Sequence, residues 1–169
     1  KHAAILRSPY PHAWIRGIDV SQALQSPGVI GILTGEDVAK MSQPFPVGVS
    51  VPPKYYSCAV DKVRFVGEPV TVVVADDRYL AEDALDLIEV DYEPLPAVVD
   101  IEEAIKPGAP ILHDNIGSNI YNHRFFKYGD MPKAYQQADL VVKGKFNFPK
   151  YGSTPIETYG VIASYNPFS

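Results

Sequence analysis

Cysteine is nearly absent from this sequence, which has Cys58 as its single thiol in 169 residues. One cysteine cannot form a disulfide within the chain. It also cannot supply the set of thiolates that a structural zinc site or an iron–sulfur cluster requires. We therefore expect no metal ligands in this chain, and any iron–sulfur chemistry must come from a partner.

Basic stretches and long apolar runs are also missing. The 15 Lys and Arg residues against 20 Asp and Glu give a net charge of −5, and no stripe of basic side chains could bind a run of phosphates. The longest apolar run, over 70–75, is far shorter than the roughly 20 residues of a membrane helix. The first residues also lack the apolar segment of a secretion signal. We expect a cytoplasmic protein with no nucleic-acid and no membrane partner.

Sixteen prolines, placed mostly between short apolar runs, predict short elements joined by turns. The length suits one domain, or one domain and the opening of another. Strands are expected over 3–7 and 13–18, pairing as a hairpin. Before residue 60 the pattern further predicts a helix from Asp19 or Ser21 through Leu24, a strand over 29–33, a helix opening at 34–37 and a loop over 41–57.

The strongest periodicity lies in a strand–helix–strand unit over 63–92. Its strands are expected over 63–66, 70–74 and 88–92, with Leu80, Ala84, Leu87 and Ile88 at helical spacing between the last two. We expect this unit to form the centre of the core. Either Val73→Asp or Leu87→Asp should then destabilise the protein strongly, because an unpaired charge is costly to bury.

The last third of the chain has weaker patterns. Asp100 and Glu103 resemble a capping box for a short helix ending near 106–108, and 111–128 is predicted to be a linker over a surface. A helix from Asp130 through Ala138 and strands over 139–148 and 159–165 would begin a second unit.

Candidate chemistry is sparse. His2, His12, His113 and His123 lack the spacing that places two ligands on one helix face. Gly67-Glu68-Pro69 could hold a catalytic carboxylate on a strained turn, but a plain turn between strands is favoured. The segment over 152–158 embeds a carboxylate, Glu157, among small and hydroxyl residues. We predict no catalytic residue in this chain.

Several stretches, in order and spacing, resemble the large, molybdenum-binding subunits of the xanthine dehydrogenase, aldehyde oxidase and carbon monoxide dehydrogenase family. They are 7–13, 18–19, 27–29, 33–37, 61–70, 73–75, 90–96 and 129–130, together with the helix that holds Ala81 and Ala84 and the helix that ends at 138–139. The resemblance implies an α+β fold: an a/b hammerhead domain over 1–128, followed by the first strands of a truncated molybdopterin-binding domain over 129–169.

The resemblance also implies the chemistry of the full enzyme, which hydroxylates an aldehyde, carbon monoxide or an N-heterocycle with oxygen from water. Molybdenum–molybdopterin, expected in its cytosine dinucleotide form, belongs to the full subunit. FAD and 2Fe–2S clusters belong to partners, a medium FAD-binding subunit and a small iron–sulfur subunit. This fragment is expected to be structural, inactive and free of cofactor by itself.

Within this fragment, Glu157 matches a family motif near the cofactor-bearing half, which implies at most an indirect contact with the cofactor through other residues, or a role in anchoring a strand. The alternative is a free-standing binding or assembly module that shares only the fold. The substrate, the electron acceptor and the oligomeric state stay open.

Overall fold

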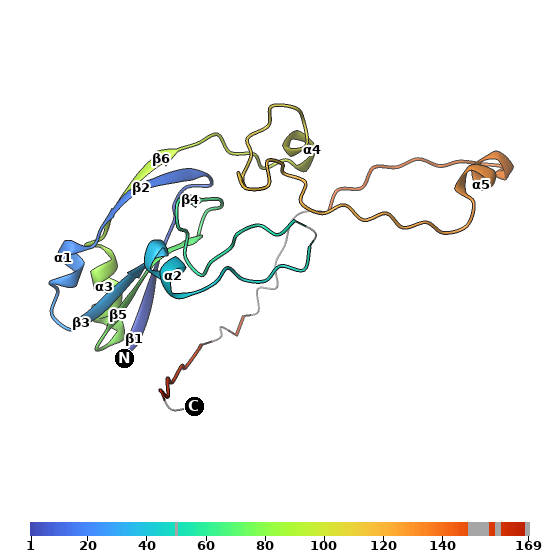
Figure 1. Ribbon diagram of the computed structural model, residues 1–169. Coiled ribbons are helices and arrows are strands. Elements are labelled where there is room, and N and C mark those ends of the chain that lie inside the picture. The colour runs from blue at the N-terminus through green and yellow to red at the C-terminus, as the bar shows by residue number, and fades with distance from the viewer. Residues whose placement is uncertain (50, 149–155, 158–159, 168–169) are drawn as a thin grey trace. The chain divides into compact units, whose positions relative to one another are not determined.

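The computed structural model describes residues 1–49, 51–148, 156–157 and 160–167. The chain divides into two compact units, Lys1–Phe125 and Phe126–Ser169. Figure 1 labels the helices and strands of both.

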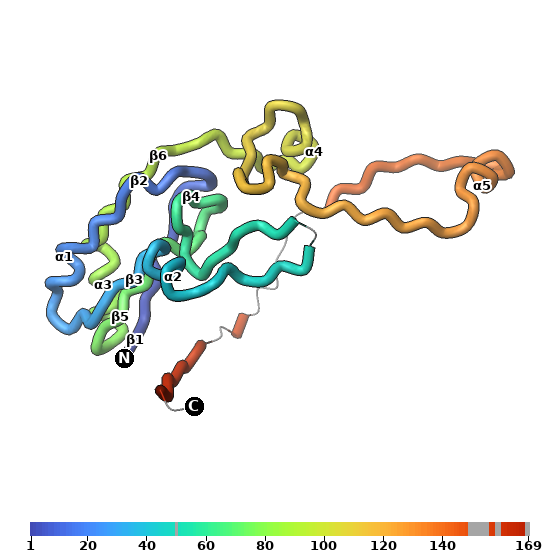
Figure 2. Tube along the Cα trace, in the orientation of Figure 1, coloured from blue at the N-terminus to red at the C-terminus, as the bar shows by residue number. Residues whose placement is uncertain are grey.

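Two antiparallel sheets of three strands form the first unit (Figures 1 and 2). The first sheet has the order β1 (His2–Arg7), β5 (Pro69–Ala75), β3 (Val29–Thr34). The second has the order β4 (Lys62–Val63), β2 (Ala13–Asp19), β6 (Glu89–Pro94). With its helices, the unit has the α+β fold expected from the sequence.

The expected hairpin between the first two strands is wrong. β1 pairs with β5 and β2 pairs with β4 and β6, so the two strands lie in different sheets. The proline-rich segment between them is tied to the turn before β5, where Ser8 N donates to Glu68 O at 2.9 Å and Gly67 N donates to Ser8 O at 2.8 Å. These bonds fix the segment by which the chain passes from the first sheet to the second, so β1 and β2 are not joined by a tight turn.

Among the described residues, three short helices lie between the strands in the sequence and two follow the last strand. They are α1 (Ser21–Leu24), α2 (Gly35–Met41), α3 (Arg78–Leu85), α4 (Ile101–Ala104) and α5 (Met131–Gln137). Thr34 and Asp37 form a capping box on α2, and Asp100 caps α4 as expected. At α1, the N-cap is Val20 without a side-chain bond, while Asp19 accepts from Ser21 N at 2.8 Å.

The core centre lies in the predicted strand–helix–strand unit. Val63 and Val70 belong to one buried cluster, and Val73 packs with Ala84 and Ile88 in another. Two details of the prediction are wrong. The strand expected over 63–66 ends at Val63, because a turn follows at once. Leu87 lies past the end of α3 and is 40% exposed, so it is not a core residue.

In the second unit, α5 forms where it was predicted, with Asp130 accepting from Lys133 N. The strands expected over 139–148 and 159–165 are absent from the described residues, 139–148 and 160–165. Leu140, Val142, Phe146 and Phe148 are exposed instead. An isolated strand is unstable without hydrogen-bonded neighbours and a covered apolar face. The alternating pattern alone therefore does not produce a strand here.

No helix within the described ranges combines the length and the apolar character needed to cross a membrane.

Candidate functional site

A cluster of charged side chains surrounds the short strand β4. Lys62 is only 1% exposed although it carries an ammonium group. Its Nζ donates to Asp114 Oδ2 at 2.6 Å and to Ile111 O at 3.4 Å. It also lies 4.9 Å from the centroid of the Trp14 ring, which adds a cation–π contact. A buried ammonium needs such partners, because desolvation would otherwise be costly.

Arg64 extends the same cluster. Its Nε donates to Leu112 O at 3.1 Å and its Nη1 donates to Lys62 O at 2.6 Å. Its Nη2 pairs with Asp61 Oδ1 at 3.3 Å. Lys62 thus binds both ends of the segment 111–114, and Arg64 binds Leu112 between them. We call this arrangement, Asp61, Lys62, Arg64 and Asp114, the charge clamp.

The charge clamp was missed in the sequence analysis, which treated 111–128 as a linker over a surface. The region has no regular element over 111–128, as predicted, but its first residues are fixed to β4. Two basic residues at alternate positions, Lys62 and Arg64, were the available signal. Such a signal does not identify the acidic partner, because that partner is distant in the sequence.

Glu68 lies beside the clamp and is 4% exposed. Its carboxylate accepts a hydrogen bond from Arg64 N, across a turn in which Gly67 has a φ of +88°. Burial raises the pKa of the Glu68 carboxyl above its ordinary value, and the bonds from the turn partly oppose this. The turn expected for Gly67-Glu68-Pro69 is confirmed, and the bond to Arg64 N favours a structural role for the carboxylate.

His113 is the neutral member of this region. Burial lowers the pKa of the His113 imidazole, and the nearby Arg64 and Lys62 charges lower it further. Its Nδ1 is buried without a hydrogen-bond partner among the described residues. A proton added there would place a third positive charge beside two others.

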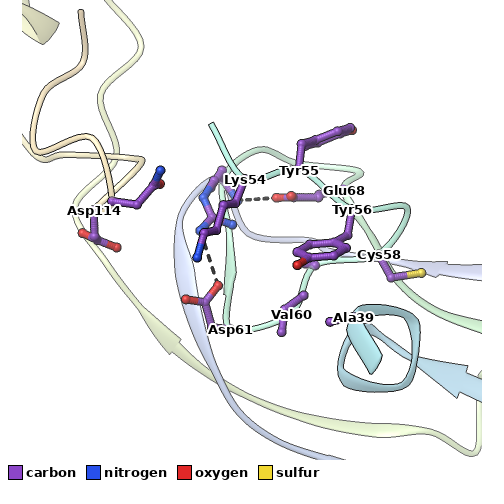
Figure 3. Close-up of a pocket in the computed structure, with 12 residues that line it drawn as sticks. Ala39, Lys54, Tyr55, Tyr56, Cys58, Val60, Asp61, Glu68 and Asp114 are labelled. Atoms are coloured by element: carbon purple, nitrogen blue, oxygen red, sulfur yellow. Dashed lines mark hydrogen bonds and ion pairs between the residues drawn. The ribbon is translucent and has the colours of Figure 1, made fainter. Parts of the chain in front are cut away.

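A pocket of about 330 Å³ opens next to the clamp (Figure 3). Among the residues that line it are Tyr55, Tyr56, Cys58, Arg64 and Glu68. Burial raises the pKa of the Cys58 thiol, which keeps the sulfur protonated and a weak nucleophile. The pocket therefore combines polar groups without an activated nucleophile.

The other candidate residues are not brought together with this cluster. His12 Nδ1 lies 2.7 Å from Pro96 O, and its ring is buried. Within the part of the chain that the structure describes, no three His, Cys, Asp or Glu side chains gather as metal ligands. Glu157 is exposed, and residues 152–155 and 158 of its segment lie outside the described residues.

The two three-stranded antiparallel sheets and their short helices form a small α+β domain of the a/b hammerhead class. Residues 1–96 match the family described as aldehyde oxidase and xanthine dehydrogenase, a/b hammerhead domain. The chain belongs to this family of molybdenum hydroxylases.

Curated relatives agree along nearly the whole chain. The carbon monoxide dehydrogenase large chain of Hydrogenophaga pseudoflava is 32% identical over 98% of this chain and 22% of its own length. The nicotine 6-hydroxylase large subunit of Paenarthrobacter nicotinovorans is 34% identical over 97% of this chain and 20% of its own length. The chain thus spans about a fifth of these relatives.

Solved structures give the same result. Quinoline 2-oxidoreductase from Pseudomonas putida 86 matches with a TM-score of 0.67 and 43% identity, over 72% of this chain and 16% of that one. A Cu,Mo-containing carbon monoxide dehydrogenase matches with a TM-score of 0.67 and 34% identity, over 82% of this chain and 19% of that one.

Proposed function

We propose that this chain is the N-terminal part of the large subunit of a molybdenum hydroxylase, in which it acts as a structural and docking domain. The observation that carries the proposal is the match of residues 1–96 to the hammerhead domain, continued by similarity to large subunits along nearly the whole chain. Oxidative hydroxylation with oxygen from water would then be the activity of the complete subunit.

The two units suggest how the chain is organised. We assign the hammerhead domain to 1–128 and the start of a molybdopterin-binding domain to 129–169, and the division after Phe125 supports a boundary in this region. The charge clamp fixes 111–114 to β4, shortly before the first unit ends. Its role is to hold the exit of the hammerhead domain in place.

Molybdenum–molybdopterin would supply activation of water and acceptance of electrons from the substrate in the complete subunit. By the family resemblance, the loops that would hold the pterin dinucleotide lie downstream of Ser169. We therefore place the cofactor, in its cytosine dinucleotide form, outside these residues. Glu157 keeps at most an indirect role.

FAD and 2Fe–2S clusters would be on separate medium and small subunits, and the whole complex would be cytoplasmic. The names of relatives support a complex of subunits, among them the 6-hydroxypseudooxynicotine dehydrogenase complex subunit gamma of Paenarthrobacter nicotinovorans. Relatives named for carbon monoxide and for nicotine are 32% and 34% identical to this chain. Such similar values give no preference for one substrate over the other.

The deciding experiment is to read the gene downstream of Ser169 and to purify its tagged product. The proposal predicts several hundred further residues and copurification with subunits that carry flavin and iron, detected by absorbance and elemental analysis. A reading frame that stops shortly after Ser169, with no such subunits, would instead support a free-standing binding or assembly module.

A further inference from the structure

The first sheet has one apolar face that the described residues leave partly open. Two rows of paired residues cross β1, β5 and β3 on this face: Ile5, Val72 and Leu33, then Ala3, Val74 and Gly31. We call these six residues the outer face. Ile5 is 41% exposed and Leu33 is 37% exposed, while Val72 and Val74 are partly buried.

The opposite face of the same sheet is covered. Ala81 of α3 packs with Ala4 and Ala75, and Ala84 packs with Val73. The four larger side chains of the outer face belong to none of the three buried clusters of the described residues. The helix therefore covers only one side of the sheet.

The composition of β5 indicates a strand that is buried on both sides. An antiparallel strand with one solvated face normally alternates apolar and polar residues. Here Val72, Val73 and Val74 follow each other without a polar residue, and no residue of the outer face is charged or polar. An uncharged apolar face of this kind is typical of a permanent contact.

The size of the outer face identifies the kind of occupant. A stable interface between separate proteins uses about 20–30 residues on each side. Six residues are too few for that, but they suffice when the occupant belongs to the same polypeptide, because covalent linkage supplies a high effective concentration. The relatives are much longer than the matched region, since this chain covers only 20–22% of them.

We propose that the outer face docks a segment of the same large subunit, from the part that follows Ser169. The inference rests on the proposed function and adds to it the surface that is used and the partner that covers it. The occupant presents apolar side chains and becomes part of a continuous core with β1, β3 and β5.

Cysteine labelling tests this inference. Leu33→Cys is introduced into the full-length subunit and into the 169-residue chain, and the rate of reaction with a maleimide is measured in both. Tyr79→Cys is the matched control, because Tyr79 is exposed on α3, which covers the opposite face of the sheet. Thermal melting of each variant shows that it is folded.

We expect the Leu33→Cys thiol to react at least about tenfold more slowly in the full-length subunit than in the short chain. The rate at Tyr79→Cys should change less. Equal rates at Leu33→Cys in both proteins would overturn the inference. Equal protection of both cysteines from the maleimide would also overturn it. So would protection of Leu33→Cys that requires another subunit, or that occurs in the short chain when it forms a dimer. Absence of a longer subunit would instead refute the proposed function.

Discussion

Lys62 and Asp114 are separated by 52 positions in the sequence, and their side chains meet with an Nζ–Oδ2 distance of 2.6 Å. The ammonium is almost completely buried, while more than half of the Asp114 side chain is exposed. The buried Lys62 ammonium, which needs a partner, is therefore paired with an Asp114 carboxylate that remains accessible to solvent. Their contact connects β4 to the end of the first unit.

Asp114→Ala should destabilise the chain by about 1–3 kcal/mol, because it leaves the buried Lys62 ammonium without its carboxylate. Adding Lys62→Met should recover part of this loss, because the buried charge is then removed. Chemical denaturation measures both changes. Asp83→Ala, on the exposed surface of α3, is the control. A free energy of unfolding for Asp114→Ala within about 0.5 kcal/mol of the wild type would contradict the clamp.

Val73→Asp and Leu87→Asp, which the sequence pattern treats alike, should differ. Val73 is fully buried on β5, the central strand between β1 and β3. An aspartate there should lower the free energy of unfolding by several kcal/mol. Leu87 is 40% exposed, and its aspartate can reach solvent. Thermal melting should show a large fall for the first variant and a small one for the second. Similar falls would mean that Leu87 is buried in the folded protein.

His113 should make stability depend on pH. Its pKa is lowered in the folded chain, so the unfolded chain binds the proton more readily. The stabilisation is present above the ordinary histidine pKa and is lost as the pH falls through the lowered value. In His113→Gln this loss should be reduced when urea unfolding is measured from pH 7 to pH 4. Parallel profiles for wild type and variant would refute the assignment.

Local features of this fold were predictable from the sequence, because they depend on neighbouring residues. The capping residues Thr34 and Asp100 and the turn at Gly67 are of this kind. The pairing of β1 with β5 was not predictable, because the short spacing to β2 suggested a hairpin. Alternation gave no means of knowing which strand would be the neighbour.

The site was less predictable than the fold. Lys62 and Arg64 look like solvated charges on a half-buried strand, and only the folded chain brings Leu112 and Asp114 to them. For the strands expected over 139–148 and 159–165, the sequence pattern predicted more regular structure than the described residues have. Their apolar alternation is clear, but the described residues supply no neighbouring strand for them.

Residues 139–148 and 160–165 should therefore exchange their amide hydrogens rapidly in this chain by itself. Hydrogen exchange can be compared between the whole chain and a version that ends at Tyr128, with light scattering to establish the oligomeric state. The first unit should be equally protected in both, since its buried clusters lie within residues 1–125. Slow exchange throughout 139–148 and 160–165 in a monomer would show that this region folds without further partners.

The molybdenum content of the full-length protein and of the 169-residue chain tests the central claim most directly. Both are purified without a metal-binding tag from cells supplied with molybdate, and elemental analysis measures molybdenum and iron. Since the molybdopterin-binding part is proposed to lie mostly downstream of Ser169 and a single cysteine cannot hold an iron–sulfur cluster, we predict stoichiometric molybdenum in the full-length subunit and neither metal in the short chain. Stoichiometric molybdenum in the short chain, or none in the full-length subunit, would contradict the account.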